Sequence, residues 1–281
     1  MGKIDVSHNE MDGTAHVYTH GHADAVLRSH RWRTADNSAA YLLAHLKAGM
    51  QLLDVGCGPG TLTVDLARRV SPGAVVGVDL EPRVVTEAAE FAAQAGVPVH
   101  FVAGDFAGVG APPDGFDVVH AHQVLQHVAD PVGVLRSMGG LAKPGGLVAA
   151  RDADYPAMTW WPREPKLDRW MELYMQLTVI NGANADGGRQ LLHWAQAAGL
   201  VDIAYSTSTW TFSSKPDLAW WSDLWADRVT KSRMAEDLVA HGLANRVELE
   251  QISAAWRTWA RLEGAVFVVL HGEIIARTPS G

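Results

Sequence analysis

The sequence contains only one cysteine, Cys57, among its 281 residues. A lone cysteine cannot form a disulfide bond within the chain, and this scarcity is typical of proteins kept in a reducing compartment. Residues 1–12 are polar and lack the apolar centre of a secretory signal. The most apolar run, residues 265–270, is far too short to cross a bilayer. We therefore expect a cytoplasmic protein with no membrane-spanning segment.

Basic residues are also in short supply. The chain has 23 Lys and Arg against 31 Asp and Glu, which gives a formal net charge of −8. Binding to nucleic acid needs clustered basic side chains, and no basic run with interleaved aromatics occurs. Hydrophobic residues make up 48% of the chain, enough for a substantial core. These figures predict a globular protein whose partner is a small molecule, not a nucleic acid or a membrane.

The first half of the chain alternates strand and helix patterns. Leu62, Leu66 and Val70 recur at every fourth position, which is typical of a helix with one buried face. Short apolar runs ended by Gly, Pro or Asp predict strands. The predicted strands are 51–55, 74–79, 97–102, 116–121 and 147–150, and the predicted helices are 61–70, 82–95 and 131–141. Such alternation indicates an α/β fold in which helices cover both faces of a parallel sheet.

The second half has a different composition, because ten of the eleven tryptophans follow Arg151. Residues 165–180, 188–198 and most of 217–262 show helical patterns, and strands are predicted at 201–209 and within 265–276. We interpret these as helical insertions into one sheet. The chain 1–281 is then a single domain with an N-terminal arm (1–40), a nucleotide-binding core (41–150), and a helical cap followed by the final strands (151–281).

The strongest motif is Asp54-Val55-Gly56-Cys57-Gly58-Pro59-Gly60, between a predicted strand and a predicted helix. Glycines let the backbone turn tightly and approach a ligand where a Cβ would collide. Open α/β sheets bind ligands at the carboxyl ends of their strands, where this motif lies. A purely structural turn is the alternative, and the order strand, motif, helix favours a binding site.

This motif resembles the first motif of class I S-adenosylmethionine (SAM)-dependent methyltransferases. It differs from the dinucleotide pattern G-x-G-x-x-G because Gly56, Gly58 and Gly60 alternate after an acidic residue. The resemblance spans residues 18–150 and is nearest to the ubiquinone/menaquinone-biosynthesis type, which includes natural-product methyltransferases. It implies a Rossmann-like sheet, mostly parallel with an antiparallel last strand, helical insertions that form a substrate cap, and SAM as cofactor.

The resemblance also implies roles for individual residues. Asp79 ends the second strand, where a carboxylate can accept hydrogen bonds from both ribose hydroxyls. Asp105 would contact the adenine, Asp54 would orient the amino-acid end of SAM, and Tyr18 would close over the cofactor. Each acid alone could be a solvated strand-end residue, and Tyr18 could belong to a packing arm. The predicted cofactor residues are Tyr18, Asp54, Gly56, Cys57, Gly58, Gly60, Asp79, Leu80, Gly104, Asp105, Phe106, His122 and Gln123.

The chemistry needs few catalytic side chains. The methyl donor is already activated, so positioning and desolvation can supply much of the acceleration. A base is required only when the acceptor must lose a proton, and His127, in the loop after the fourth strand, is the first candidate. A capping or packing histidine is the alternative. No metal is expected, because neither His20 and His22 nor His120 and His122 have a recognisable third ligand.

Tryptophans in the second half suggest an apolar or aromatic acceptor. The runs 160–161 and 220–225 could wall such a pocket, although ordinary core or subunit packing explains the same spacing. Asp152, just after the fifth strand, could line the pocket or lie in a solvated loop. The predicted acceptor residues are Asp152, Tyr155, Trp160, Trp161 and Trp225.

These observations together predict C- or O-methylation of a small organic acceptor in secondary metabolism. Three alternatives stay open at this point: a SAM-binding relative that catalyses cyclisation without methyl transfer, a nicotinamide-dependent oxidoreductase, and a SAM-binding subunit without activity. The N-terminal arm is also compatible with a homo-oligomer that exchanges arms.

Overall fold

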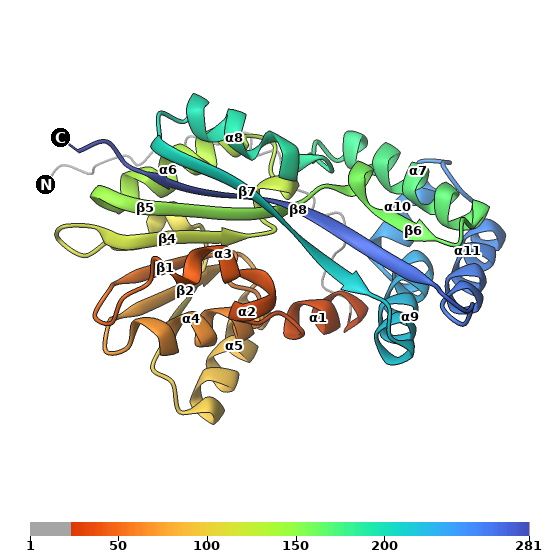
Figure 1. Ribbon diagram of the computed structural model, residues 1–281, viewed down its shortest axis with the longest axis horizontal. Coiled ribbons are helices and arrows are strands. Elements are labelled where there is room, and N and C mark those ends of the chain that lie inside the picture. Colours follow the sequence, from red (N-terminus) through yellow and green to blue (C-terminus); the bar gives the residue numbers. More distant parts are fainter. Residues whose placement is uncertain (1–23, 281) are drawn as a thin grey trace, which may run out of the picture.

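A computed structural model describes residues 24–280, and its strands form one eight-stranded sheet (Figure 1). The order across the sheet is β3-β2-β1-β4-β5-β8-β6, and β7 pairs with β8. The strands are β1 (Leu52–Val55), β2 (Val75–Asp79), β3 (His100–Ala103), β4 (Phe116–His122), β5 (Ala142–Ala153), β6 (Thr159–Trp161), β7 (Val201–Phe212) and β8 (Val266–Arg277).

Strands β1 to β5 run parallel, and β8 pairs antiparallel with β5, β6 and β7. The mostly parallel sheet with an antiparallel last strand is therefore confirmed. The antiparallel part is larger than expected, because β6 and β7 both add to β8. Since β1 lies between β2 and β4, the carboxyl ends of these three strands meet at one edge of the sheet.

Helices cover both faces of the parallel strands. Leu62, Leu66 and Val70 of α4 pack with α3 on one face, while Leu135 of α6 and Leu191 of α8 pack on the other. The helices are α1 (Asp24–Arg31), α2 (Ala35–Ser38), α3 (Ala40–Leu43), α4 (Thr61–Val70), α5 (Pro82–Ala95), α6 (Pro131–Leu141), α7 (Pro165–Ile180), α8 (Gly187–Ala197), α9 (Lys215–Lys231), α10 (Arg233–Ala240) and α11 (Arg246–Trp259). Short 3-10 turns are η1 (Phe106–Gly108), η2 (Leu125–His127) and η3 (Tyr155–Ala157).

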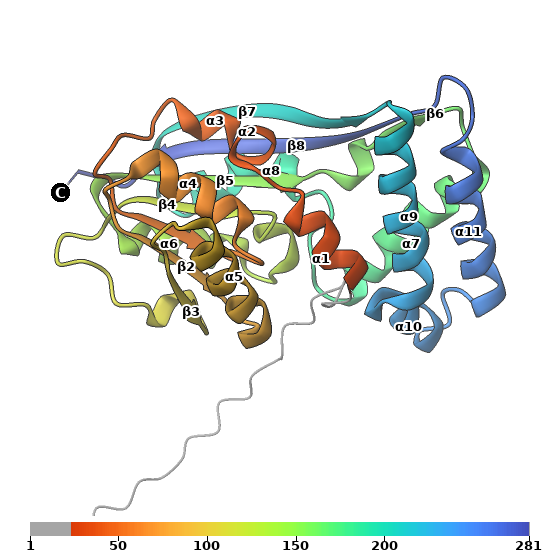
Figure 2. The ribbon, with the colours of Figure 1, turned by 90° about the horizontal axis from the view of Figure 1, so that it is seen from below.

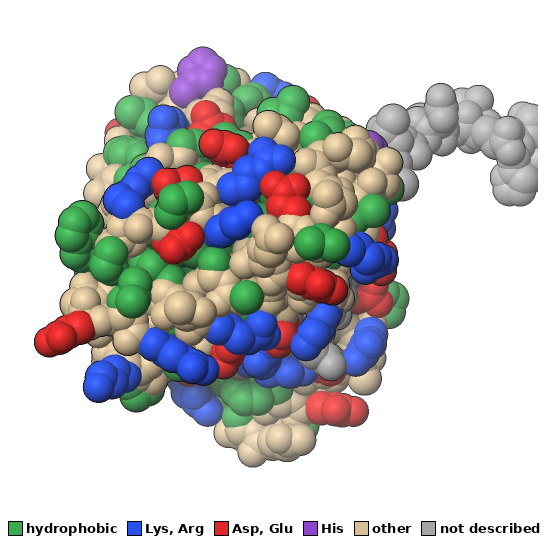
Figure 3. All heavy atoms as spheres, turned by 90° about the vertical axis from the view of Figure 1, so that its right-hand side faces the viewer, with side chains coloured by type: hydrophobic (Ala, Val, Ile, Leu, Met, Phe, Trp, Pro, Cys, Tyr) green, Lys and Arg blue, Asp and Glu red, His purple; other side chains and the backbone are tan. Residues whose placement is uncertain are grey.

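Helices α7, α9, α10 and α11 form a cap at one end of the molecule, and the long strands β7 and β8 run from the core into it (Figures 1 and 2). The cap has its own core, in which Trp170, Trp225 and Trp256 are fully buried. Figure 3 looks onto this end, where basic and acidic side chains are interspersed. Helix α1 lies between α5 and α9 (Figure 2).

Several element boundaries differ from the sequence-based predictions. The strand expected at 97–102 begins only at His100, because Pro98 cannot donate a hydrogen bond to a neighbouring strand. The strand expected at 147–150 is the much longer β5, which extends on both sides through its pairing with β4 and β8. The segment 217–262 is divided into three helices. Within residues 24–280, no helix is long and apolar enough to cross a membrane.

Candidate active site

The glycine-rich loop joins β1 to α4 in a conformation that excludes side chains. Gly56 has a φ of 68°, and a Cβ there would lie 2.5 Å from Val124 Cγ2. Gly60 caps α4 with a φ of 80°, and a Cβ would lie 2.9 Å from the Cβ of Ala88. Both positions combine a left-handed backbone with close neighbours, so only glycine fits without distortion.

Two carboxylates anchor this loop. Asp79, at the end of β2, accepts hydrogen bonds from the backbone N–H groups of Gly58 (3.0 Å) and Glu81 (3.1 Å). Asp54, at the centre of β1, is buried and accepts a bond from Thr63 Oγ1 at 2.6 Å. Its other oxygen is 2.8 Å from His120 Nδ1 on β4. Asp79 thus holds the loop from β2, while Asp54 connects β1 to α4 and β4 beside it.

A cavity of about 380 Å³ opens above these strand ends. This volume falls within the range of about 300–1,000 Å³ that is typical of small-molecule sites. All the predicted cofactor residues except Gly60 and Tyr18 line it: Asp54, Gly56, Cys57, Gly58, Asp79, Leu80, Gly104, Asp105, Phe106, His122 and Gln123. Gly60 lies just behind the loop, at the start of α4. Tyr18 lies outside the described residues.

The end of β4 supplies one wall of the cavity. Gln123 has a φ of 54°, an uncommon conformation for a residue other than glycine and one that is concentrated at functional sites. Its Oε1 accepts a hydrogen bond from Arg33 Nη2 at 2.6 Å, and its Nε2 donates to His271 Nε2 at 2.9 Å. Gln123 is therefore held in place by both the segment after α1 and β8.

His122, beside Gln123, is buried at the inner end of this wall. Burial lowers the pKa of His122 well below its ordinary value, and the nearby Arg33 and Arg151 guanidinium groups lower it further. The imidazole is therefore neutral near pH 7. Neither of its ring nitrogens has a hydrogen-bond partner among the described residues. Two unsatisfied polar atoms beside a cavity are expected where a ligand or water completes the hydrogen bonding.

Comparison with known proteins identifies the family of this site. A model described as "Methyltransferase domain" matches residues 46–200, which include the whole glycine-rich loop and β1 to β5. The chain belongs to the class I SAM-dependent methyltransferases. SAM is accordingly its cofactor, and the nicotinamide alternative is set aside.

Individual relatives agree with this assignment. The chain is 30% identical over 267 residues to an uncharacterized methyltransferase of Schizosaccharomyces pombe, with 92% of this chain and 95% of the relative covered. It is 38% identical over 100 residues to a ubiquinone biosynthesis O-methyltransferase of Cereibacter sphaeroides, across 36% of this chain and 40% of that protein. A phosphoethanolamine N-methyltransferase of Haemonchus contortus shares the fold, with 15% identity, a TM-score of 0.57, and coverage of 92% of this chain and 58% of that one.

The methyltransferase cavity fits SAM by its own chemistry. Asp79 presents a carboxylate at the end of β2 that can accept bonds from ribose hydroxyls. Gly56 and Gly58 leave room for the amino-acid end close to the backbone. Leu80, a 70% exposed apolar side chain, and Phe106 can cover an adenine ring at the opposite end. Asp105 Oδ1 accepts a hydrogen bond from the backbone N–H of Ala107 at 2.9 Å.

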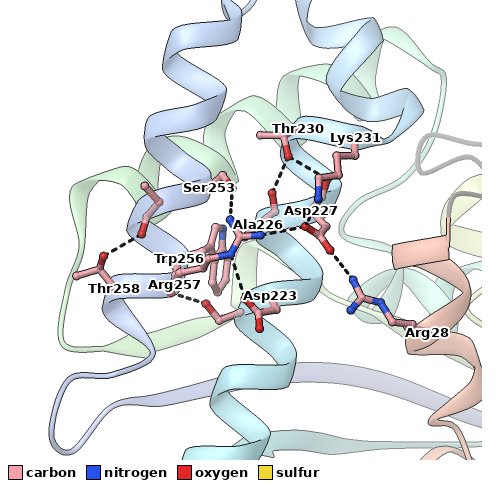
Figure 4. Close-up of polar contacts among 12 residues, drawn as sticks. Arg28, Asp223, Ala226, Asp227, Thr230, Lys231, Ser253, Trp256, Arg257 and Thr258 are labelled. Carbon is pink, nitrogen blue, oxygen red and sulfur yellow. Dashed lines mark hydrogen bonds and ion pairs between the residues drawn. The ribbon is translucent and has the colours of Figure 1, made fainter.

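Helix α1 borders this cavity and contacts both the SAM-binding core and the cap. His30, near its end, lines the cavity, and its carbonyl oxygen accepts a bond from Thr61 Oγ1 at 3.1 Å. Arg31 pairs with Glu87 on α5 at 2.9 Å. On the other side, Arg28 pairs with Asp227 of α9 at 2.7 Å, within the network drawn in Figure 4.

His127, the predicted base, lies where the sequence suggested, on η2 beside the cavity. Its environment does not suit proton abstraction. Burial, and then the charges of Arg33 and Arg228, lower the pKa of His127 to about 3. A general base works best with a pKa near the working pH. The imidazole, which is also 3.0 Å from Gln126 Nε2, is better suited to hydrogen bonding than to accepting a proton.

Asp152 lies beneath η2 and does not line either cavity beside it. Its Oδ1 accepts a bond from the backbone N–H of Gln126 at 3.2 Å, and Gln126 Oε1 accepts from the N–H of Ala153 at 2.9 Å. Burial raises the pKa of Asp152 to about 7. The residue therefore supports the turn that carries His127, and it does not lie on the wall of either cavity.

The other predicted acceptor residues separate into three groups. Tyr155 borders a small second cavity of about 20 Å³ beneath the cap. Trp160 and Trp225 belong to the core of the cap, where Trp225 is fully buried. Trp161 is 61% exposed. None of these three tryptophans lines either cavity, because Trp160 and Trp225 are packed in the core of the cap and Trp161 is exposed to solvent.

Three residues at the second cavity, Arg33, Trp210 and Arg228, were missed by the sequence analysis. Trp221, which also lines it, belongs to the run 220–225 that the sequence analysis had named as a possible pocket wall. For α9 there was a usable signal: Trp221, Trp225 and Arg228 lie three and four positions apart and so share one helix face. An arginine on the buried face of a helix is unusual and points to a specific role. No local pattern marked Arg33 or Trp210.

Within residues 24–280, no three His, Cys, Asp or Glu side chains gather as they would around a metal ion. His120 is instead hydrogen-bonded to Asp54, and His122 borders the SAM cavity.

Proposed function

We propose that this methyltransferase transfers the methyl group of SAM to a carbon or oxygen atom of a small, largely apolar or aromatic acceptor. The observation that carries the proposal is the contact between two cavities. The SAM cavity and the small cavity beneath the cap share His30, Arg33, Gln123 and His127. An acceptor admitted under the cap would therefore face the cofactor across the end of β4.

The walls of the second cavity favour an acceptor with a flat apolar body. Tyr155, Met158, Trp210 and Trp221 surround it. Aromatic rings bury large areas and hold flat ligands in defined orientations. Two of these side chains stack on further aromatic rings. Tyr155 stacks on Tyr174 with 4.0 Å between ring centroids, and Trp221 stacks on Phe212 with 4.5 Å. The pocket is thus rigid on its cap side.

The roles of the chain's own residues follow from this arrangement. SAM, when bound, supplies a methyl group that is already activated for transfer. The glycine-rich loop and Asp79 would hold the cofactor, while Gln123, fixed by Arg33 and His271, would set the position of the acceptor. Helix α1 and the cap would exclude water. This division corresponds to an arm within 1–40, a SAM-binding core at 41–150 and a cap with the final strands at 151–281, in one domain.

The wider setting is also part of the proposal. We place the reaction in the biosynthesis of small molecules, as secondary metabolism, in the cytoplasm. A homo-oligomer is compatible with this arrangement, and light scattering of the purified protein would measure its state. No nucleic acid is expected among its partners.

The test is a product analysis. The purified chain is incubated with SAM carrying a labelled methyl group and with a panel of phenols, enols and carboxylated aromatics. We expect one methyl group to be added to the acceptor for each S-adenosylhomocysteine formed. A product of unchanged mass would instead favour the cyclisation alternative, which the fold alone does not separate from methyl transfer. Cofactor binding without turnover of any acceptor would favour a binding subunit.

A further inference from the structure

The sheet ends in three edge strands that differ in length. β3 (His100–Ala103) has four residues, and β6 (Thr159–Trp161) has three. β7 (Val201–Phe212) has twelve, and within residues 24–280 it pairs only with β8. Figure 2 shows β7 along the outer margin of the molecule. Because an edge strand presents unpaired N–H and C=O groups, β7 offers the longest such row in the described part of the chain.

The sequence of β7 lacks the features that usually protect an edge strand. Proteins protect such edges with short strands, charged side chains, proline or bulges. The one charged residue of β7, Asp202, lies at the start of the strand, where the pairing with β8 changes register. Residues 203–212 contain no charged residue, proline or glycine, and seven of them are Ile, Thr, Tyr, Trp or Phe, which favour strands. This stretch therefore favours pairing with a further strand.

The middle of β7 is open to solvent. Tyr205, Ser206 and Thr207 are all exposed, and the aromatic side chain of Tyr205 keeps 38% of its area in contact with water. Near the end of the strand α2 approaches instead, because the indole N–H of Trp210 donates to the carbonyl oxygen of Asn37 at 2.6 Å. The stretch that is free to pair therefore lies before Trp210 and is centred on residues 205–207.

We propose that two copies of the chain associate through β7, which pairs antiparallel with β7 of the second copy about a twofold axis near Ser206. A second copy fits this edge because antiparallel pairing about a twofold axis makes the strand complementary to itself and closes after two copies. The unpaired N–H and C=O groups of each strand are then satisfied by those of the other. No like charges face each other across the pair, since residues 203–209 are uncharged. The inference does not depend on the proposed function.

The first experiment measures the mass of the purified protein by light scattering and its dissociation constant by sedimentation. We expect the mass of two chains. Thr207→Lys should raise the dissociation constant by at least about ten-fold, because it brings two ammonium groups together at the twofold axis. Thr159→Lys is the matched control, since Thr159 is exposed on the edge strand β6. Both variants should bind S-adenosylhomocysteine like the wild type, because neither residue lines the SAM cavity.

The second experiment is oxidative crosslinking, which decides the question if Thr207→Lys does not fold. Cys57, the one cysteine of the sequence, is buried, so the wild type should not crosslink. Facing residues of antiparallel strands have Cα atoms about 4.5–5.5 Å apart, within reach of a disulfide. Ser206→Cys or Thr207→Cys should therefore form covalent dimers, whereas Thr159→Cys should not.

Three results would overturn the inference. One is a wild type with the mass of a single chain at high micromolar concentration. Another is a dimer that Thr207→Lys leaves intact and that neither Ser206→Cys nor Thr207→Cys crosslinks, because the copies would then meet elsewhere. The third is an assembly that grows beyond two copies, since a twofold β7 pair closes. None of these results bears on the proposed methyl transfer.

Discussion

The SAM-binding core and the cap position their side chains in different ways. In the core, most of the residues that line the cavity lie at the ends of β1, β2, β3 and β4 or in the turns that follow these strands, so the local backbone places them. In the cap, aromatic side chains come from helices and from β7, and most of them fill the core between these elements. A turn residue is constrained locally, whereas a helix residue is placed by whatever packs against it.

Residue type therefore predicts the location of a residue better in the SAM-binding core than in the cap. A glycine at position 56 or 60 is required by backbone conformation and by neighbours closer than 3.0 Å. A tryptophan in the cap can be buried, as at 225, exposed, as at 161, or part of a cavity wall, as at 221. The following predictions test whether this division between the two regions is real.

The largest effect is expected in the cap. Trp225→Ala should reduce the free energy of unfolding by about 3–5 kcal/mol, because it leaves a large hole in a closely packed core. The affinity of the folded protein for S-adenosylhomocysteine should stay the same, since Trp225 does not line the SAM cavity. Denaturant unfolding and calorimetry measure the two quantities. Trp161→Ala, at an exposed position, should change stability by no more than about 0.5 kcal/mol.

The second prediction concerns the glycine-rich loop. In Gly56→Ala, the added Cβ would meet Val124, so the loop and the end of β4 must move apart. Both line the SAM cavity, and we expect binding of S-adenosylhomocysteine to weaken by about 100-fold. Gly96→Ala is the control, because Gly96 has a similar φ of 66° but no atom within 4 Å of the new Cβ. Unchanged affinity in Gly56→Ala would contradict the account of the loop.

The third prediction concerns the carboxylate of Asp79. Asp79→Asn should weaken binding of S-adenosylhomocysteine by about ten-fold, because an amide is a poorer acceptor for two ribose hydroxyls than a carboxylate. Asp117→Asn removes the same charge far from the cavity, where Asp117 pairs with Lys143. That control should bind normally. If both variants lost affinity equally, net charge and not the contact at Asp79 would be responsible.

The last prediction concerns a pH dependence in the turn that supports His127. Folded Asp152 keeps its proton up to a pKa of about 7, whereas the unfolded carboxyl loses it near its ordinary pKa of about 3.9. Between these values the unfolded state binds fewer protons, so this group lowers stability as the pH rises from about 4 to about 7. Asp152→Asn should therefore gain stability relative to the wild type across this window, by up to about 4 kcal/mol, because each pH unit between the two pKa values contributes about 1.36 kcal/mol. Urea unfolding at several pH values measures the difference, and parallel curves would argue against a buried, protonated Asp152.

The sequence predicted the fold correctly, and most of the residues it singled out line one cavity, because both depend on local signals. The strand ends at Val55 and Asp79, and the start of α4 at Thr61, follow from apolar runs and glycine turns. The second cavity, which we propose as the acceptor site, was harder to predict. Arg33 and Trp210 reach the same cavity from segments far apart in the chain, and only the pairing of β7 with β8 brings Trp210 there.

His127 shows a second limit of sequence-based prediction. Its position beside the cavity was predicted correctly, but its chemistry depends on charges from two distant elements. Burial together with Arg33 and Arg228 lowers the pKa of His127 to about 3 and removes the property that made it a candidate base. A side chain's location can follow from its place after a strand, whereas its pKa depends on the complete three-dimensional surroundings.

The most direct test of the central claim is calorimetric titration of the purified protein with SAM, S-adenosylhomocysteine, NADH and NADPH. The cavity formed by the glycine-rich loop, Asp79 and Asp105 should bind the two sulfur nucleotides, with one site per chain, and neither nicotinamide cofactor. Binding of a nicotinamide cofactor alone would contradict the account and would make Asp79 part of a dinucleotide site.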